Sequence, residues 1–432
     1  MNRIVLIGNG FDLAHDLKTS YANFIDWYWK SRILKLKQKT TNVSEDKLCK
    51  ITLLKERAWS IFIHSHLNKL KESEGRDIYQ YLKDHPKAFE IKISEFFDNI
   101  CKHLETKRWV DIENEYYELL TKYALEKNDE TKVKELNGQL QFLQDKLIEY
   151  LSSVNKTEVE PIESIKSAIY SQFRPLDISV GGMHSLNEHL KRDLESDDKE
   201  IRNKLWKYNY NLYLKDSSDF DEILLKIKDY KEEYAMIQDI KKSSPDTNPT
   251  LNYLEFYDCP VELLYPNRIM LLSFNYTKTV KLYCPKSFDI FSINQIHGEV
   301  AKPESVIFGY GDEMDEKYKE LVNKNNNLLL GNIKSIKYLE TDNYRKMLEF
   351  IESDSYQVCI MGHSCGNSDR TLLNTLFEHR NCVSVKPYYH KKEDGTDNYL
   401  DLVQNISRNF NDMKLMRDRV VNKVYCKPLT EP

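Results

Sequence analysis

The clearest pattern along the chain is a set of short, continuous apolar runs that end in polar or glycine-containing turns. The runs lie at residues 4–7, 268–274, 292–296, 305–308, 357–361 and 383–389. Because their apolar residues do not alternate with polar ones, each run is typical of a parallel strand covered on both faces. Helical spacing between several runs predicts an open α/β sheet whose strand ends form one crevice.

Residues 35–250 differ from both ends of the chain, because they are rich in Lys, Glu, Leu and Tyr and carry apolar residues at helical spacing. Examples of this spacing are Trp59, Ile63 and Leu67, and then Leu136, Leu140, Leu143, Leu147 and Tyr150. A Ser-Ser-Pro-Asp-Thr-Asn-Pro segment at 243–249 marks a boundary. We therefore predict one sheet-containing domain made of residues 1–34 and 251–432, with residues 35–250 inserted as an all-helical domain.

Composition narrows the functional classes. In 432 residues, 63 Lys and Arg nearly balance 68 Asp and Glu, and the formal charge of -5 gives no clear nucleic-acid signal. No run approaches the roughly 18 apolar residues that span a bilayer, and the first residues form a strand instead of a signal peptide, so we expect a cytoplasmic protein without a membrane partner. The eight cysteines include no Cys-x-x-Cys pair, so we expect no metal site.

The first apolar run ends in the turn Gly8-Asn9-Gly10-Phe11-Asp12. Glycines directly after a buried strand permit a tight turn and the close approach of a ligand, so a phosphate or ribose of a small nucleotide could bind here. The turn lacks the third glycine of the dinucleotide fingerprint, and a purely structural turn would look the same. This segment alone leaves both interpretations open.

Two further strand ends carry side chains suited to chemistry. Asn275 follows the run at 268–274, and its amide can donate to and accept from a ribose hydroxyl or a water. His297 follows the run at 292–296, and an imidazole can take a proton near neutral pH. The alternatives are an Asx turn and a structural histidine.

A second turn, Gly362-His363-Ser364-Cys365-Gly366, follows the run at 357–361 and precedes a predicted helix. Its backbone amides could bind phosphate or ribose oxygens. The same spacing resembles the Gly-x-Ser-x-Gly nucleophile elbow, so a serine hydrolase that uses Ser364 is an alternative. Its acid and base would have to come from Asp369, Glu378, Asp394, Asp397 or Asp401 with His379 or His390.

The densest acidic and aromatic cluster of the insertion lies at residues 109–117. Most such runs are solvated helix faces. One carboxylate, for which Glu113 is the candidate, could instead point into the crevice and stabilise an oxocarbenium ion, as carboxylates do in glycoside cleavage.

Several of these segments together resemble the AbiH family of bacterial phage abortive-infection proteins. The resemblance runs essentially from end to end, although the inserted middle matches only in character. It is carried by residues 8–13, by 17–21 with Phe24, and by 109–113, 274–277, 296–298 and 362–366 with Asp369.

AbiH proteins are in turn similar to sirtuin-like domains, which have a Rossmann-type NAD site. Asn275 falls at the asparagine of the sirtuin Thr-Gln-Asn-x-Asp motif, and His297 falls at the catalytic histidine. The chain departs from that pattern in three ways: Thr277 stands at the aspartate of the motif, the zinc-ribbon cysteines are missing, and a large insertion is present. The resemblance therefore implies a Rossmann-like, sirtuin-like fold and favours NAD hydrolysis over protein deacylation.

The resulting hypothesis is an antiphage abortive-infection effector that binds NAD and hydrolyses it to nicotinamide and ADP-ribose. Asn275 would orient water or ribose, His297 would act as general base, and Glu113 would stabilise the cationic sugar. Phe24 and Tyr276 would pack on the rings of the nucleotide. The predicted binding residues are Gly8, Asn9, Gly10, Phe11, Asp12, Ser20, Tyr21, Phe24, Tyr276, Gly362, His363, Ser364 and Asp369.

Alternatives from other functional classes also stay open. The same pocket could only sense a nucleotide, while the helical domain binds a phage-derived trigger or a second copy of the chain. Purified protein distinguishes these hypotheses, because an enzyme releases nicotinamide, a sensor binds without cleavage, and a serine hydrolase reacts with a fluorophosphonate at Ser364.

Overall fold

The computed structural model describes residues 1–38, 42–54, 70, 75–107, 111–212, 219–243, 259–284 and 290–431. The predicted helical positions Trp59, Ile63 and Leu67 lie outside these residues, as do residues 109 and 110 and the loop at 244–249. Within the described part of the chain, no helix is long and apolar enough to cross a membrane.

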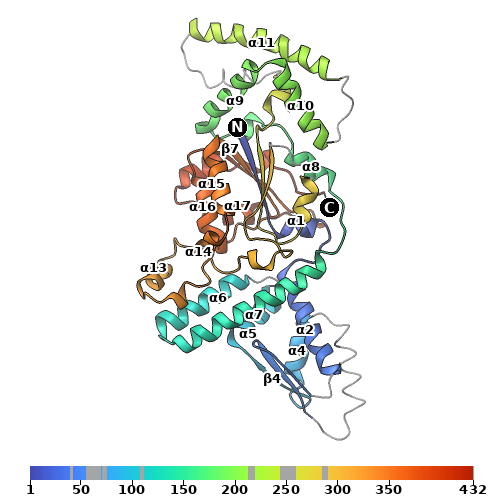
Figure 1. Ribbon diagram of the computed structural model, residues 1–432, viewed down its shortest axis with the longest axis vertical. Helices are drawn as coiled ribbons and strands as arrows, with labels where there is room; N and C mark the ends of the chain where they lie inside the picture. The colour runs from blue at the N-terminus through green and yellow to red at the C-terminus, as the bar shows by residue number, and fades with distance from the viewer. Residues whose placement is uncertain are drawn as a thin grey trace.

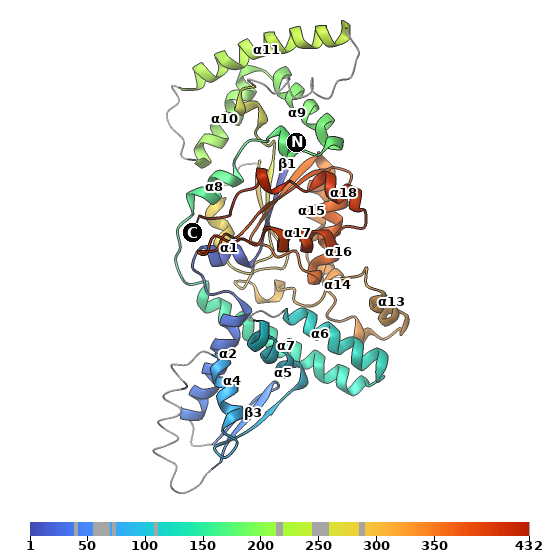
Figure 2. The same cartoon turned by 180° about the vertical axis from the view of Figure 1, so that it is seen from behind.

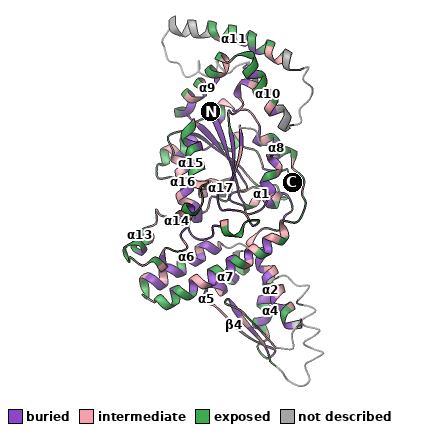
Figure 3. Ribbon diagram, in the orientation of Figure 1, coloured by how far each residue is buried: buried purple, intermediate pink, exposed green. Residues whose placement is uncertain are grey.

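A five-stranded parallel sheet forms the centre of the molecule (Figure 1). Its strands are β1 (Asn2–Ile7), β5 (Ile269–Ser273), β6 (Phe291–Gln295), β7 (Tyr356–Met361) and β8 (Cys382–Tyr388), in the order β6-β5-β1-β7-β8. Every residue of β1, β5, β7 and β8 is buried, as the purple strands in Figure 3 show. The prediction of parallel strands is therefore confirmed for these five runs, and burial on both faces is confirmed for all of them except β6, an edge strand that is partly exposed.

The prediction of a strand at residues 305–308 is wrong. Residues 303–305 form a 3₁₀ turn and residues 306–308 pair with no strand. The apolar side chains of this segment are buried for a different reason, because Ile307 packs in the core beside the sheet and Phe308 packs in the core of the insertion. The backbone N–H of Ile307 donates to the carbonyl of His297, which fixes this segment against the end of β6.

Alternate residues of β1 face different helices, as the pleat of a strand requires. Ile4 and Leu6 pack on the side of α15 (Asn343–Ser353), α16 (Arg370–Glu378), α17 (Tyr399–Arg408) and α18 (Met413–Arg419). Val5 and Ile7 pack on the side of α1 (Asn9–Ala14) and α8 (Glu163–Ile169). Helices therefore cover both faces of the sheet, as Figure 2 shows from behind.

The segment inserted between β1 and β5 lies at both ends of the sheet (Figures 1 and 2). At the end where β5, β6 and β7 begin lie α9 (Met183–Glu195), α10 (Asp198–Leu212) and α11 (Asp219–Ser243). At the opposite end lies a lobe, here called the carboxyl-end lobe. Its helices are α2 (Tyr21–Gln38), α4 (Gly75–Asp84), α5 (Glu95–Lys107), α6 (Ile112–Thr121), the π-helix η1 (Lys122–Glu126) and α7 (Glu130–Val154).

The prediction that the insertion is all-helical is wrong. The carboxyl-end lobe contains an antiparallel sheet of β2 (Val43–Glu45), β3 (Cys49–Leu53) and β4 (Phe89–Ile93). In β3, alternate residues Cys49, Ile51 and Leu53 are buried, which is the period of a half-covered strand. The helix predicted from Leu136, Leu140, Leu143, Leu147 and Tyr150 is confirmed as α7.

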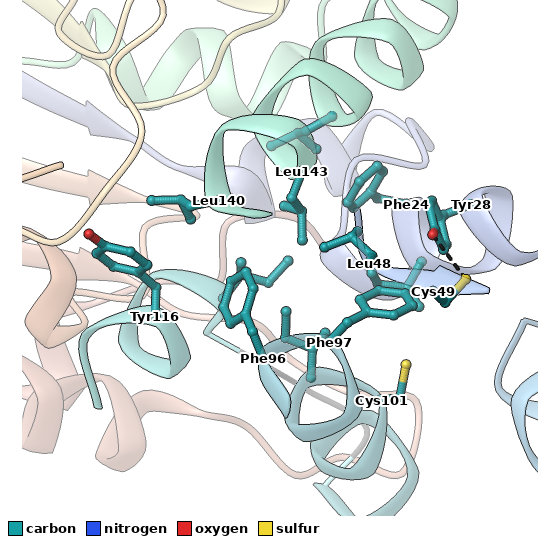
Figure 4. Packing of buried hydrophobic residues seen from close by; sticks show 14 of the residues in the cluster. Phe24, Tyr28, Leu48, Cys49, Phe96, Phe97, Cys101, Tyr116, Leu140 and Leu143 are labelled. Atoms are coloured by element: carbon teal, nitrogen blue, oxygen red, sulfur yellow. Dashed lines mark hydrogen bonds between the residues drawn. The ribbon is translucent and has the colours of Figure 1, made fainter. Parts of the chain in front are cut away.

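The core of the carboxyl-end lobe joins residues from distant parts of the sequence (Figure 4). Phe24 and Tyr28 of α2 pack there with Phe97 of α5 and Leu143 of α7. Residues that follow β6 also belong to this core, among them Val300, Phe308, Tyr310, Leu321 and Leu329. The lobe therefore shares one core with the segment that follows β6. This core holds the lobe at the carboxyl end of the sheet, where the strand-end turns lie.

Candidate functional site

A cavity of about 480 Å³ lies between the carboxyl ends of the strands and the carboxyl-end lobe. Its volume is within the roughly 300–1,000 Å³ range of small-molecule sites. The turns after β1, β5, β6 and β7 line it from the sheet, and α2, α6 and α7 line it from the lobe. The four strand ends that the sequence singles out therefore meet at one cavity.

The turns after β1 and β7 are held together by glycines. A side chain at Gly8 would come within 2.5 Å of the His363 Cα, and a side chain at Gly362, which has φ +74°, would come within 2.1 Å of the Phe11 nitrogen. The N–H of Gly10 donates to the carbonyl of Gly362 at 2.8 Å, and the N–H of Gly8 donates to the carbonyl of Met361 at 3.2 Å. These two amides are therefore already used within the protein, although Gly8, Asn9 and Gly10 line the cavity.

Asn275 anchors the end of β5 to the turn after β1. Its Nδ2 donates to the carbonyl of Gly8 at 2.9 Å, and its backbone N–H donates to the Ser273 hydroxyl. Beside it, Thr277 donates its hydroxyl to Oδ2 of Asp12 at 2.7 Å. The other oxygen of Asp12, Oδ1, is buried without a hydrogen-bond partner, and burial raises the pKa of Asp12.

Asp369 orients two histidines at the end of β7. Its Oδ1 lies 3.3 Å from Nε2 of His297, and its Oδ2 lies 3.6 Å from Nε2 of His363. The Tyr338 hydroxyl lies 3.1 Å from the same nitrogen of His297. An ionised carboxylate can only accept a hydrogen bond, so we assign the ring proton of neutral His297 to Nε2. The Nδ1 of His297 is then the nitrogen that can take a proton.

Lys334 connects this group to the carboxyl-end lobe. It begins the short helix α14 (Lys334–Lys337) and is 1% exposed. Its Nζ donates to Oδ1 of Asp369 at 2.8 Å and to Oε2 of Glu113 at 2.9 Å. Oε1 of Glu113 accepts from the backbone N–H of Gly309 at 3.3 Å. Glu113 comes from α6, so the lobe contributes one carboxylate to the same cluster.

Burial and this ion cluster set the protonation states. Burial alone would raise the pKa of Asp369, but Lys334 and His297 outweigh it and hold that pKa well below its usual range. Burial lowers the pKa of His297, as does the nearby ammonium of Lys334, so the ring is neutral at pH 7. Burial raises the pKa of Glu113 to about 7, with Lys334 acting in the opposite direction. At neutral pH the cavity thus holds an ionised Asp369 and a neutral His297.

Fourteen of the sixteen predicted site residues line the cavity, and Phe11 and Phe24 do not. Phe11 packs in the core with Tyr283, at 5.2 Å between ring centroids. Phe24 is 1% exposed in the core of the lobe (Figure 4), so its predicted packing on a nucleotide ring is not supported. The residues that do line the cavity are Gly8, Asn9, Gly10, Asp12, Ser20, Tyr21, Glu113, Asn275, Tyr276, His297, Gly362, His363, Ser364 and Asp369.

The geometry does not favour Ser364 as a hydrolase nucleophile. Among the described residues, no histidine is hydrogen-bonded to its hydroxyl, and the positive φ of +54° belongs to Cys365. His379 pairs with Glu352, and the side chain of Asn405 donates to the carbonyl of Ser364. Cys365 is itself fully buried, and burial raises the pKa of its thiol, which makes it a poor nucleophile.

Sequence reasoning missed Lys334 altogether, and it noted Asp111 and Thr277 without including them among the site residues, although all three line the cavity. Asp111 is the N-cap of α6, where its Oδ1 accepts from the Asn114 N–H, and it lines the cavity. The sequence did contain a signal for Asp111, because an Asp directly before a helix is a typical N-cap residue. An N-cap at Asp111 places it close to Glu113 in the first turn of α6. Lys334 has no comparable signal, since it lies in a loop-rich segment 35 residues before Asp369 and 221 residues after Glu113.

Fold and site together define an α/β protein with a charged cavity at the carboxyl ends of its parallel strands. The family model for bacteriophage abortive infection, AbiH, matches residues 4–390. The chain belongs to the AbiH family, which places it among proteins of phage abortive-infection defence. A search of the curated proteins and a search of the solved structures each gave no significant match.

Proposed function

We propose that the cavity binds NAD and hydrolyses its nicotinamide glycosidic bond, so that the protein depletes NAD during phage infection. The observation that carries this proposal is the cluster of His297, Asp369 and Glu113, with Asn275, in one cavity at the carboxyl ends of the strands. In open α/β sheets, ligands bind at this edge, where the strand order reverses. The order β6-β5-β1-β7-β8 corresponds to 3-2-1-4-5, which is the order of dinucleotide-binding sheets.

The chemistry needs few groups. When the bond between C1′ of the ribose and the pyridinium nitrogen breaks, its electron pair goes to that nitrogen and neutral nicotinamide leaves. A water then attacks C1′, and its proton goes to Nδ1 of His297. The products are nicotinamide, ADP-ribose and one proton, which balances the reaction.

The remaining groups act on charge and position. The carboxylate of Glu113 would face the cationic sugar, since a fixed negative charge beside the ribose stabilises the positive charge that develops there. Asn275 would hold the water or a ribose hydroxyl. Tyr21, Phe274 and Tyr276 are aromatic residues of the lining that could contact a ring. The resemblance to sirtuin-like domains supports the same assignment of Asn275 and His297.

The test is an assay of purified protein with NAD. We expect release of nicotinamide and ADP-ribose, and loss of this release in His297→Ala and Asn275→Ala variants that keep the far-UV spectrum and melting temperature of a folded protein. His379→Ala is the matched control, because that histidine pairs with Glu352 away from the cavity. Binding of NAD without cleavage would favour the nucleotide sensor, and fluorophosphonate labelling of Ser364 would favour the hydrolase.

A further inference from the structure

Lys334 occupies an unusual position for a lysine. Its side chain is 1% exposed and lies between two carboxylates that come from separate parts of the fold. Asp369 belongs to the turn after β7, and Glu113 belongs to α6 of the inserted lobe. Burying an ammonium is costly unless it is paired, and Lys334 has two carboxylates as partners.

The two carboxylates are held differently. Asp369 has His297 and His363 as further partners. Glu113 has only the Gly309 N–H, at 3.3 Å, among the described hydrogen bonds besides Lys334. Removing Lys334 would therefore leave Asp369 with two imidazole neighbours and Glu113 without a positive charge in contact.

Glu113 is surrounded by few groups that favour its ionised form. Burial and the neighbouring Asp369 and Asp111 raise the pKa of Glu113, and Lys334 is the group that lowers it. The titratable groups that face Glu113 electrostatically are Lys334, Lys337, Asp369, Asp111, Tyr21, Tyr276 and Tyr338. Only the two lysines are cations, and Lys337 donates to the Phe308 carbonyl and the Asn332 side chain instead.

We infer that Lys334 is a positioning residue that favours the ionised form of Glu113, so that the inserted lobe can present a carboxylate to the reacting sugar at neutral pH. This inference rests on the proposed function for its consequence and on the ion cluster for its geometry. A protonated Glu113 would offer no negative charge to an oxocarbenium ion, and the reaction would then slow. Lys334 therefore sets the lowest pH at which the site works.

The test compares the pH dependence of nicotinamide release in wild type, Lys334→Met, Lys334→Gln and Lys334→Arg. We expect the acidic limb to move upward by at least about one pH unit in the first two variants, so that kcat at pH 6 falls about tenfold with little change in KM. Lys334→Gln keeps N–H donors without the charge, so it remains informative if Lys334→Met does not fold. Lys334→Arg restores the charge and is expected to restore the limb.

Lys337→Met is the matched control, because it removes a half-buried lysine of the same helix, and this lysine is hydrogen-bonded to other groups and not to Glu113. Lys337 still faces Glu113 electrostatically, so we expect a shift of the acidic limb that is clearly smaller than in Lys334→Gln. An acidic limb that moves equally in Lys337→Met and Lys334→Gln would overturn the inference, because destabilisation alone would then explain the shift. So would an acidic limb that stays at the wild-type pH in Lys334→Gln.

A second readout separates this inference from the proposed function. The carboxyl ¹³C signal of Glu113, assigned by its absence in Glu113→Gln, can be titrated without any substrate. A higher titration midpoint in Lys334→Gln supports the inference even if the protein does not cleave NAD, and an unchanged midpoint overturns it. Failure of wild type to release nicotinamide would contradict the proposed function alone.

Discussion

Two buried lysines of this protein, one in the sheet and one at the start of a helix, differ in the ion pairs that they form. Lys386 on β8 pairs with one carboxylate, Oδ2 of Asp177, at 2.6 Å, and neither residue lines the cavity. Lys334 pairs with two carboxylates at 2.8 and 2.9 Å, and all three residues line the cavity. The first pair is neutral and sealed, whereas the second cluster keeps a net negative charge next to space for a ligand. Excess charge beside a cavity is typical of functional sites.

The largest expected effect on stability comes from breaking the buried ion pair of Lys386 and Asp177. Lys386→Met leaves Asp177 buried without a counter-ion, so the free energy of unfolding should fall by about 3–5 kcal/mol. Urea unfolding measures this loss, and adding Asp177→Asn should recover most of it. Nicotinamide release per folded molecule should stay at the wild-type value, and a specific loss of activity would contradict the structural role of this pair.

The variant Glu113→Gln tests the role of the cluster of Lys334, Glu113 and Asp369 beside the cavity. The amide fits the same space but carries no charge, so kcat for NAD should fall about 100-fold while the protein stays folded. Steady-state kinetics checks this value. Glu118→Gln, on the exposed side of the same helix, is the control and should change neither kcat nor stability. Full activity in Glu113→Gln would remove Glu113 from the proposed chemistry.

The free energy of unfolding should depend on pH differently in wild type and in Glu113→Gln. Because burial raises the pKa of Glu113 from 4.5 to about 7, the folded state holds this proton more tightly than the unfolded state. Glu113 therefore stabilises the fold fully below about pH 4.5, and this contribution is lost as the pH rises toward 7. Wild type should lose stability relative to Glu113→Gln across this window, as measured by urea unfolding at several pH values. A constant difference would contradict the raised pKa.

The smallest expected effect concerns Phe24, which lies in the core of the lobe and does not line the cavity. Phe24→Leu removes part of a buried ring that contacts Trp27 and Tyr150, at centroid distances of 6.1 and 5.9 Å. The loss of stability should be below about 1.5 kcal/mol, because the replacement is apolar and only somewhat smaller. KM for NAD should not change. A raised KM at unchanged stability would instead show that Phe24 contributes to ligand binding.

The sheet was predictable because a strand buried on both faces leaves a local mark in the sequence. Continuous apolar residues identified β1, β5, β6, β7 and β8, but the same rule failed at 305–308, where the apolar residues serve two different cores. The small sheet of the insertion also had a local signal, since Phe-Glu-Ile-Lys-Ile at β4 alternates apolar and polar residues. That signal is short and lies within a region of helical composition.

The site was predictable only in part, for a physical reason. Turn residues such as Asn275 and His297 are marked by the strands that precede them, and the sheet brings them together. The use of the Gly8 and Gly10 amides by the turn after β7, and the position of Lys334 between two carboxylates, depend on contacts between distant segments. No local pattern encodes such contacts.

The most direct test of the account is the NAD content of cells during phage infection. Cells that carry the wild-type protein should lose NAD and accumulate nicotinamide after infection, and cells that carry His297→Ala at equal protein level should keep their NAD. Equal NAD loss in both strains, or no loss in a wild-type strain that still resists the phage, would contradict the claim that this cavity hydrolyses NAD.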